Sequence, residues 1–167
     1  MNLVLAAAQT VAGPQYRNLL IQAGLARWLD APPPPTMDPA ATEAELAHLF
    51  GTVYTLLGEP GTRLMLRNWG TTLTPVITTI PVAQQIVAAV LALPPAERWP
   101  RALARLVELT APFWAPATLR EDATTWYLTL TDGPVCAEIR GASAPLCPNL
   151  VASYPRLLQV MTAGGPR

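Results

Sequence analysis

The chain has 167 residues, of which 51% are hydrophobic and 13% are charged, and eleven basic side chains balance eleven acidic ones. Without a net charge or a run of basic residues, the sequence excludes the usual signs of binding to nucleic acid or to an anionic membrane surface. This length is typical of one domain with a sizeable core, so we expect a single domain over residues 1–167. Two cysteines without a secretory signal favour a cytoplasmic protein.

The N-terminal part is predicted to be helical, with breaks at glycine and proline. Residues 3–11 predict a short apolar helix that Gly13 and Pro14 end, and residues 15–29 predict a second helix with a broad apolar face. Residues 31–35 hold a run of prolines, which lack the backbone N–H and restrict the residue before them. We therefore expect a stiff extended connector there.

A capping signal opens the next predicted helix. Thr42 and Glu45, three residues apart, match a capping box. Residues 58–61 (Gly-Glu-Pro-Gly) indicate a turn, after which residues 63–69 restart a helix. Gly70 is expected to end it, because glycine is common just after the last helical residue.

Two more helices are predicted between prolines, over residues 81–93 and 95–109. The apolar stretch 76–93 is interrupted by Pro81 and carries two glutamines, so we interpret it as a buried core helix and not as a membrane span.

The pattern changes in the C-terminal part. Residues 124–131 alternate and are rich in Thr, Trp, Tyr and Leu, which predicts a strand. The pair Asp132-Gly133 is a hairpin signal, and residues 134–140 are expected to form the partner strand. A last helix is predicted over residues 148–161. This order predicts an α+β fold in which N-terminal helices pack with a C-terminal antiparallel hairpin and a final helix.

Aromatic side chains are the first candidates for a binding site. They could line an apolar cleft for a small molecule, although such residues more often form plain core. The set is Trp69, Trp99, Phe113, Trp114, Trp126 and Tyr127.

Polar candidates lie on two of the predicted helices. Arg63 and Arg67, four residues apart, could hold a carboxylate such as a tetrapyrrole propionate. The alternatives are an ion pair with Glu59 or a solvated face. His48 could act as a general base or an axial ligand, but it is more simply a partly exposed helix residue, and no nucleophile with a carboxylate can be assigned around it.

Cys136 and Cys147 are separated by ten residues, unlike a close zinc-binding pair. They could belong to a metal or redox site or line a pocket. The alternative is that both are buried and act as small hydrophobic residues.

Three stretches resemble, in the same order, the 4-vinyl-reductase domain family. They are LLIQAGLARWLDAPPPP (19–35), LFGTVYTLLGEPGTRLMLRNWG (49–70) and YLTLTDGPVCAEIRGASAPLCPNLVASYPRLLQVMTAGG (127–165). The resemblance implies an α+β fold shared with trafficking subunits of the TRAPP complex and with haem-based nitric-oxide sensors. It also implies an apolar pocket for a small hydrophobic ligand and a homodimer.

The sequence departs from the family's cysteine pattern. Gly133 stands at the first cysteine position, Pro148 replaces a histidine, and the chain ends at Arg167 before the last cysteines of the pattern. A zinc site that uses Cys136 and Cys147 is therefore expected to be incomplete.

We expect a non-enzymatic domain that binds a small hydrophobic molecule, a hydrocarbon or a tetrapyrrole-like compound, as a sensor or carrier. One alternative is an enzyme or accessory factor in vinyl-group reduction of bacteriochlorophyll precursors, and another is a structural dimerisation module. The residues expected to bind the ligand are Tyr54, Arg63, Arg67, Trp69, Trp99, Trp114, Trp126 and Cys136.

Overall fold

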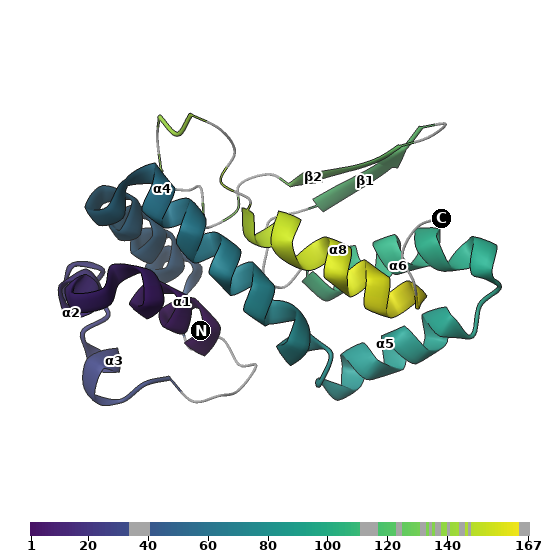
Figure 1. The fold of residues 1–167 in the computed structure, drawn as a ribbon, viewed down its shortest axis with the longest axis horizontal. Coiled ribbons are helices and arrows are strands. Elements are labelled where there is room, and N and C mark those ends of the chain that lie inside the picture. The colour runs from purple at the N-terminus through teal and green to yellow at the C-terminus, as the bar shows by residue number, and fades with distance from the viewer. Residues whose placement is uncertain are drawn as a thin grey trace. The chain divides into compact units, whose positions relative to one another are not determined.

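The described part of the chain is mostly helical, with one two-stranded antiparallel sheet before the last helix (Figure 1). This confirms the α+β class. The computed structural model forms two compact units, unit 1 with residues 1–71 and 134–149 and unit 2 with residues 72–133 and 150–167. The described residues are 1–33, 41–110, 117–122, 125–130, 133, 135, 138–139, 141–143, 146 and 148–163.

Unit 1 begins with three short helices instead of the two predicted. Helix α1 spans Asn2–Ala12 and ends at Gly13, as expected, and the 3-10 turn η1 (Gly13–Gln15) follows. The predicted helix over residues 15–29 is wrong, because it is divided into α2 (Tyr16–Gln22) and α3 (Arg27–Asp30).

Gly24 causes this division. Its φ of 69° is left-handed. The N–H of Leu25 donates to the carbonyl of Leu20 at 2.8 Å, and the N–H of Gly24 donates to that of Ile21 at 3.1 Å. These two bonds form a Schellman motif, which ends a helix by satisfying its last carbonyls.

Helix α4 (Glu43–Ile77) runs from unit 1 into the part of the chain that belongs to unit 2. The capping box at its start is confirmed: the N–H of Thr42 donates to Glu45 Oε2 at 2.8 Å, and the N–H of Glu45 donates to Thr42 Oγ1 at 3.1 Å. The helix kinks at Gly58, which has φ 66° and ψ −178°. The turn that the sequence indicates at residues 58–61 is therefore a kink within α4.

Gly70 does not end the helix, contrary to the prediction. It is buried within α4, and a Cβ placed there would lie 2.2 Å from the backbone oxygen of Asn149 and 2.7 Å from its Cα. A glycine is needed here because another backbone approaches closely, and the helix continues to Ile77.

The core of unit 1 is built from apolar side chains of α1, α2 and α4 and of the link between α2 and α3, together with three side chains from the returning segment 134–149. Such burial removes apolar surface from water and is the main favourable term in folding. The residues are Leu5, Leu19, Leu20, Leu25, Leu49, Phe50, Val53, Met65, Leu66, Val135, Ile139 and Leu146.

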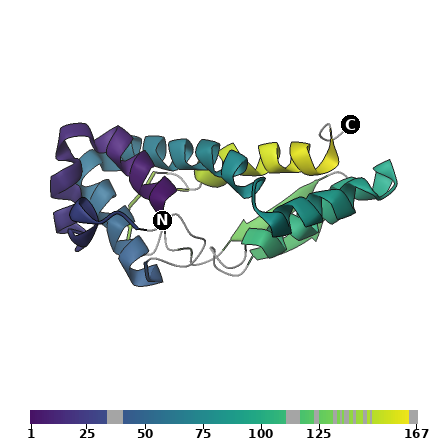
Figure 2. The ribbon, with the colours of Figure 1, turned by 90° about the horizontal axis from the view of Figure 1, so that it is seen from below.

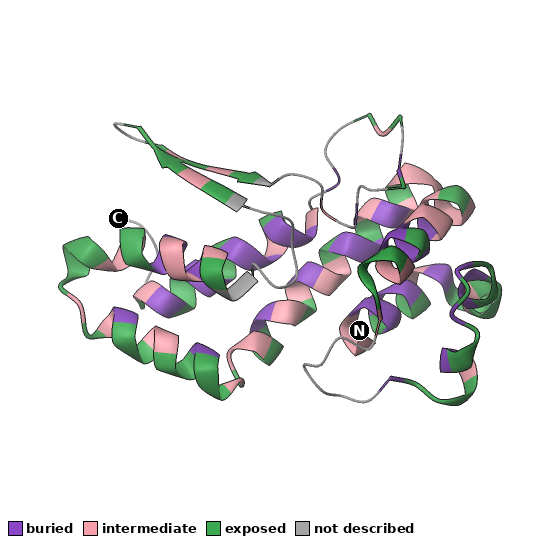
Figure 3. Cartoon of the chain, turned by 180° about the vertical axis from the view of Figure 1, so that it is seen from behind, coloured by how far each residue is buried: buried purple, intermediate pink, exposed green. Residues whose placement is uncertain are grey.

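In unit 2, helices α5 (Pro81–Leu91) and α6 (Pro95–Thr110) lie side by side (Figure 1). Both begin at the expected prolines, which suit the first helical position. The expectation of a buried core helix over 76–93 is wrong. Ala83 and Val90 are its only buried residues, because α5 is covered along one narrow stripe and its other residues are exposed or part-buried (Figure 3).

The hairpin has a different partner strand from the one predicted. Strand β2 (Trp126–Leu130) pairs antiparallel with β1 (Ala117–Glu121), with Leu119 opposite Leu128. The described residues of 134–140, namely 135, 138 and 139, are not in a strand. The turn that joins the strands is set by Asp122, whose Oδ1 accepts the N–H of Thr125 at 3.0 Å.

The hairpin shows the alternation expected for a sheet with one covered face. Arg120 and Tyr127 are exposed and opposite each other, with the guanidinium 4.6 Å from the ring centroid, whereas Leu119 and Leu128 are part-buried. The strands lie alongside α6 (Figure 2).

Helix α8 (Pro148–Thr162) matches the predicted last helix. In unit 2 it buries one apolar face, and Thr74 Oγ1 donates to the carbonyl of the buried Ser153 at 3.4 Å. The apolar side chains of this face are Leu150, Tyr154, Leu157, Leu158 and Met161.

Candidate functional site

Two acidic side chains of unit 1 join α4 to the segment 134–149, which carries both cysteines. Glu59 of α4 accepts the N–H of Ser143 at 2.8 Å and its hydroxyl at 2.7 Å. Glu138 of the segment lies 3.0 Å from Nδ1 of His48 on α4. The segment is thus held at two points by contacts that span 84 and 90 residues.

The first contact belongs to a cluster of Glu59, Arg63 and Ser143, which we call the Glu59 cluster. Arg63 Nε donates to Glu59 Oε1 at 2.9 Å, one helical turn along α4. The backbone N–H of Ser143, then its hydroxyl, then Arg63 lower the pKa of Glu59 from 4.5 to about 2, because each donates to the ionised carboxylate. The cluster is therefore ionised at neutral pH, and the charge of Arg63 is balanced within it.

The second contact pairs a histidine with a carboxylate. The side chains of His48 and Glu138 are 53% and 45% exposed, so water screens the pair. Gly51 makes the approach possible, because a Cβ there would lie 2.9 Å from Glu138 Oε2. Among the described residues, Glu138 is the sole hydrogen-bond partner of the imidazole. The arrangement can orient the ring, and it supplies the carboxylate that the sequence could not assign.

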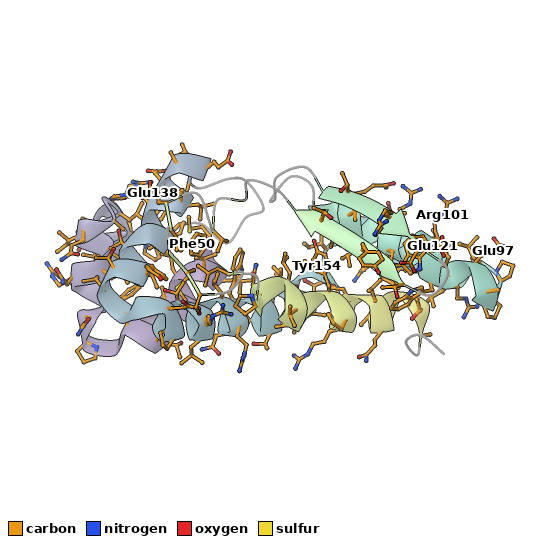
Figure 4. The ribbon with its side chains drawn as sticks, turned by 90° about the horizontal axis from the view of Figure 1, so that it is seen from above. Phe50, Glu97, Arg101, Glu121, Glu138 and Tyr154 are labelled. Carbon is orange, nitrogen blue, oxygen red and sulfur yellow. The ribbon has the colours of Figure 1, made fainter. Side chains whose placement is uncertain are left out.

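An aromatic pair lies on α4 in the same unit. The rings of Phe50 and Trp69 are stacked, with centroids 6.0 Å apart and an interplanar angle of 27°. Phe50 is buried, whereas Trp69 and Tyr54 are partly exposed. Figure 4 shows Phe50 and Glu138 with the other side chains of unit 1. The indole of Trp69 is thus partly exposed and is held in place by its contact with the buried ring of Phe50.

Unit 2 contains an open depression of about 330 Å³ on α6. Glu97 and Arg101, which project from that helix (Figure 4), give it one charge of each sign. Its remaining described lining is Ala96, Pro100 and Ala104, so the predicted ligand-binding residues are not part of it. A shallow surface with paired charges differs from the enclosed apolar pocket that the resemblance implies.

The residues predicted to bind a ligand are divided between the two units. Unit 1 holds Tyr54, Arg63, Arg67 and Trp69, all on α4, and unit 2 holds Trp99 and Trp126, both partly exposed. Trp114, Cys136 and Cys147 lie outside the described residues, as does Phe113.

The two arginines differ in their surroundings. Arg63 forms the ion pair with Glu59, which is the alternative left open by the sequence. Arg67 is exposed and has no ion-pair partner within the described part of the chain. Within that part of the chain, Arg67 is therefore the arginine of the two whose charge has no acidic partner.

No three His, Cys, Asp or Glu side chains come together among the described residues to hold a metal ion. Because both cysteines lie outside those residues, the zinc prediction stays a prediction. No family model, curated protein or solved structure matches the chain, and the resemblance to the 4-vinyl-reductase domain family likewise stays a prediction.

Proposed function

We propose that the chain binds a small hydrophobic molecule, a hydrocarbon or a tetrapyrrole-like compound, against the aromatic side chains of α4 in unit 1. The observation that carries this proposal is the stacked pair of Phe50 and Trp69. A partly exposed indole held in place by a buried ring offers a flat apolar surface at little cost in side-chain entropy. Tyr54, also partly exposed on this helix, adds a second aromatic surface.

Arg67 is the side chain we assign to a carboxylate on the ligand. Its guanidinium is exposed, whereas Arg63 is already held by Glu59. Arginine recognises a carboxylate through two parallel N–H donors. A ligand without a carboxylate would bind through apolar contact alone, driven by about 25 cal/mol per Å² of apolar surface buried.

Native mass spectrometry of freshly purified protein tests this function. The native mass should exceed the denatured mass by the mass of the bound molecule. Trp69→Leu should lose most of this extra mass, and Trp99→Leu, which removes a partly exposed tryptophan from unit 2, should keep it. Far-UV circular dichroism checks that both variants fold. Equal native and denatured masses would contradict binding, and loss only in Trp99→Leu would place the site in unit 2.

A second candidate function is pairing with another copy of the chain. It is favoured by two large apolar side chains exposed in unit 1, Ile21 (50%) and Leu64 (48%). Large exposed apolar side chains that group into one patch mark interaction sites in soluble proteins. The same native spectra would show a dimer, and Leu64→Asp should shift it to the monomer mass. A monomer for the unmodified chain would exclude this function.

A further inference from the structure

A long stretch of the chain lacks any charged residue. No Asp, Glu, Lys, Arg or His occurs between Arg67 and Glu97, which leaves 29 uncharged residues. At the chain's own charged fraction of 13%, about four would be expected there. The stretch contains the end of α4, the turn that follows, and all of α5.

This stretch lies on the surface of unit 2. We call residues 72–96 the uncharged elbow, and Thr74, Ala83 and Val90 are its only buried residues. Val76 and Val82, on either side of the turn, are 39% and 53% exposed. A well-behaved protein surface has charges at about a quarter to a third of its positions, so about four would be usual among the exposed residues here. An exposed region of this size without a charge is suited to contact with an apolar phase, into which the transfer of a charged side chain is costly.

Three polar side chains at the bend donate hydrogen bonds to backbone carbonyls of the elbow. Thr78 Oγ1 donates to the carbonyl of Thr74 at 3.1 Å, and Thr79 Oγ1 donates to that of Val76 at 2.7 Å. Gln84 Nε2 donates to the carbonyl of Thr78 at 3.3 Å, beyond the end of α4. Backbone and hydroxyl groups that enter an apolar phase need such internal partners, because water is absent there.

The hydropathy of α4 and α5 also favours contact with a lipid bilayer. No single described helix is long and apolar enough to cross a membrane, but α4 and α5, bent by 78°, meet that criterion together. Within unit 2 the elbow is followed by Glu97, Arg98 and Trp99. Tryptophan and arginine at the end of an apolar segment are typical of segments that lie at the boundary between headgroups and acyl chains.

We propose that the uncharged elbow inserts shallowly into a lipid bilayer, entering and leaving by the same side. The bend between α4 and α5 leads, so Thr78 and Thr79 enter together with Val76 and Val82, and their internally bonded hydroxyl groups lower the cost of leaving water. Because the elbow has no charge, the hydrophobic effect drives insertion. Binding therefore does not need anionic lipid.

Flotation with vesicles of phosphatidylcholine alone tests the proposal. The protein should float with the vesicles, equally in 0.05 and 0.5 M salt. Val82→Asp should reduce the vesicle-bound to free ratio about tenfold or more, because transfer of one valine side chain from water is worth roughly that factor. Val76→Asp is a second elbow variant. The matched control is Val151→Asp, which places the same charge on α8 at a residue that is 75% exposed and outside the elbow.

Four results would overturn the proposal. They are no flotation of the unmodified chain, an equal loss in Val151→Asp, flotation that requires anionic lipid and disappears in 0.5 M salt, and a dimer in solution that Val82→Asp dissociates without any vesicle binding. The last result would assign the elbow to a second copy of the chain. Circular dichroism of each variant confirms that a loss of flotation does not reflect unfolding.

Discussion

Alanine at position 70 should destabilise the protein, although alanine is the better helix former. Gly70 lies inside α4, where replacing glycine by alanine normally stabilises a helix by about 1 kcal/mol. At this position the new Cβ would lie 2.2 Å from the carbonyl oxygen of Asn149. That atom belongs to the backbone, so it cannot move aside by changing a rotamer. The helix α4 and the start of α8 must separate instead.

The size of the effect follows from these two opposing terms. Overpacking a core contact costs about 1–3 kcal/mol, and the upper half of that range applies because the obstructing group is backbone. Subtracting about 1 kcal/mol for the gain in helix propensity leaves a net loss of about 1–2 kcal/mol. For a chain of this length, each kcal/mol lowers the melting temperature by about 2–4 °C. We expect a decrease of about 2–8 °C.

Urea unfolding and calorimetry of Gly70→Ala measure this loss. Gly133→Ala is the control, because no atom lies within 4 Å of a Cβ there and the position has no positive φ, so its stability should change by less than about 0.5 kcal/mol. The sign of the change in the free energy of unfolding of Gly70→Ala distinguishes a steric clash from a gain in helix propensity. A variant as stable as the unmodified chain, or more stable, would refute the close approach of Asn149 to α4.

Two further predictions concern local hydrogen bonds. Because the pKa of Glu59 is 4.5 unfolded and about 2 folded, its cluster stabilises the fold above pH 4.5 and this contribution is lost as the pH falls towards 2. Glu59→Gln should therefore flatten the fall of the urea midpoint over that range, and an unchanged slope would count against the cluster. Thr42→Ala, which removes the capping oxygen, should cost about 1 kcal/mol. Thr55→Ala, whose hydroxyl only returns to the carbonyl of Gly51, should cost less than about 0.5 kcal/mol, and equal costs would argue against the cap.

Local signals in the sequence predicted where most helices begin and end. Proline fixes φ and lacks an N–H, which places the starts of α5 and α6 at Pro81 and Pro95. The Thr42–Glu45 capping box is likewise encoded within four residues. Gly24 was missed because the apolar periodicity continues across it, and Gly70 was misread because its role depends on a residue 79 positions away.

The partner strand and the polar contacts of unit 1 could not be predicted, for two different reasons. The Asp132-Gly133 pair is a strong turn signal, but the strand before it pairs with β1 through a turn at Asp122, which carries no glycine. Contacts of Glu59 with Ser143 and of His48 with Glu138 join distant positions, and no periodicity marks them. The aromatic candidates could be identified by type, but their division between two units depends on the tertiary fold.

Gly58 and Gly70 both shape α4, but for different physical reasons. At Gly70 the obstacle is a neighbouring atom, whereas at Gly58 the nearest atom to a Cβ is Pro60 Cδ at 3.7 Å, an ordinary contact. The φ of 66° and ψ of −178° at Gly58 are the mirror image of the extended backbone that L-residues adopt freely. A D-amino acid at position 58 would therefore adopt these backbone angles without strain. The backbone angles of the kink are strained for every L-residue because of the position of its Cβ. Glycine, which has no Cβ, is the only one of the twenty coded residues to which that constraint does not apply.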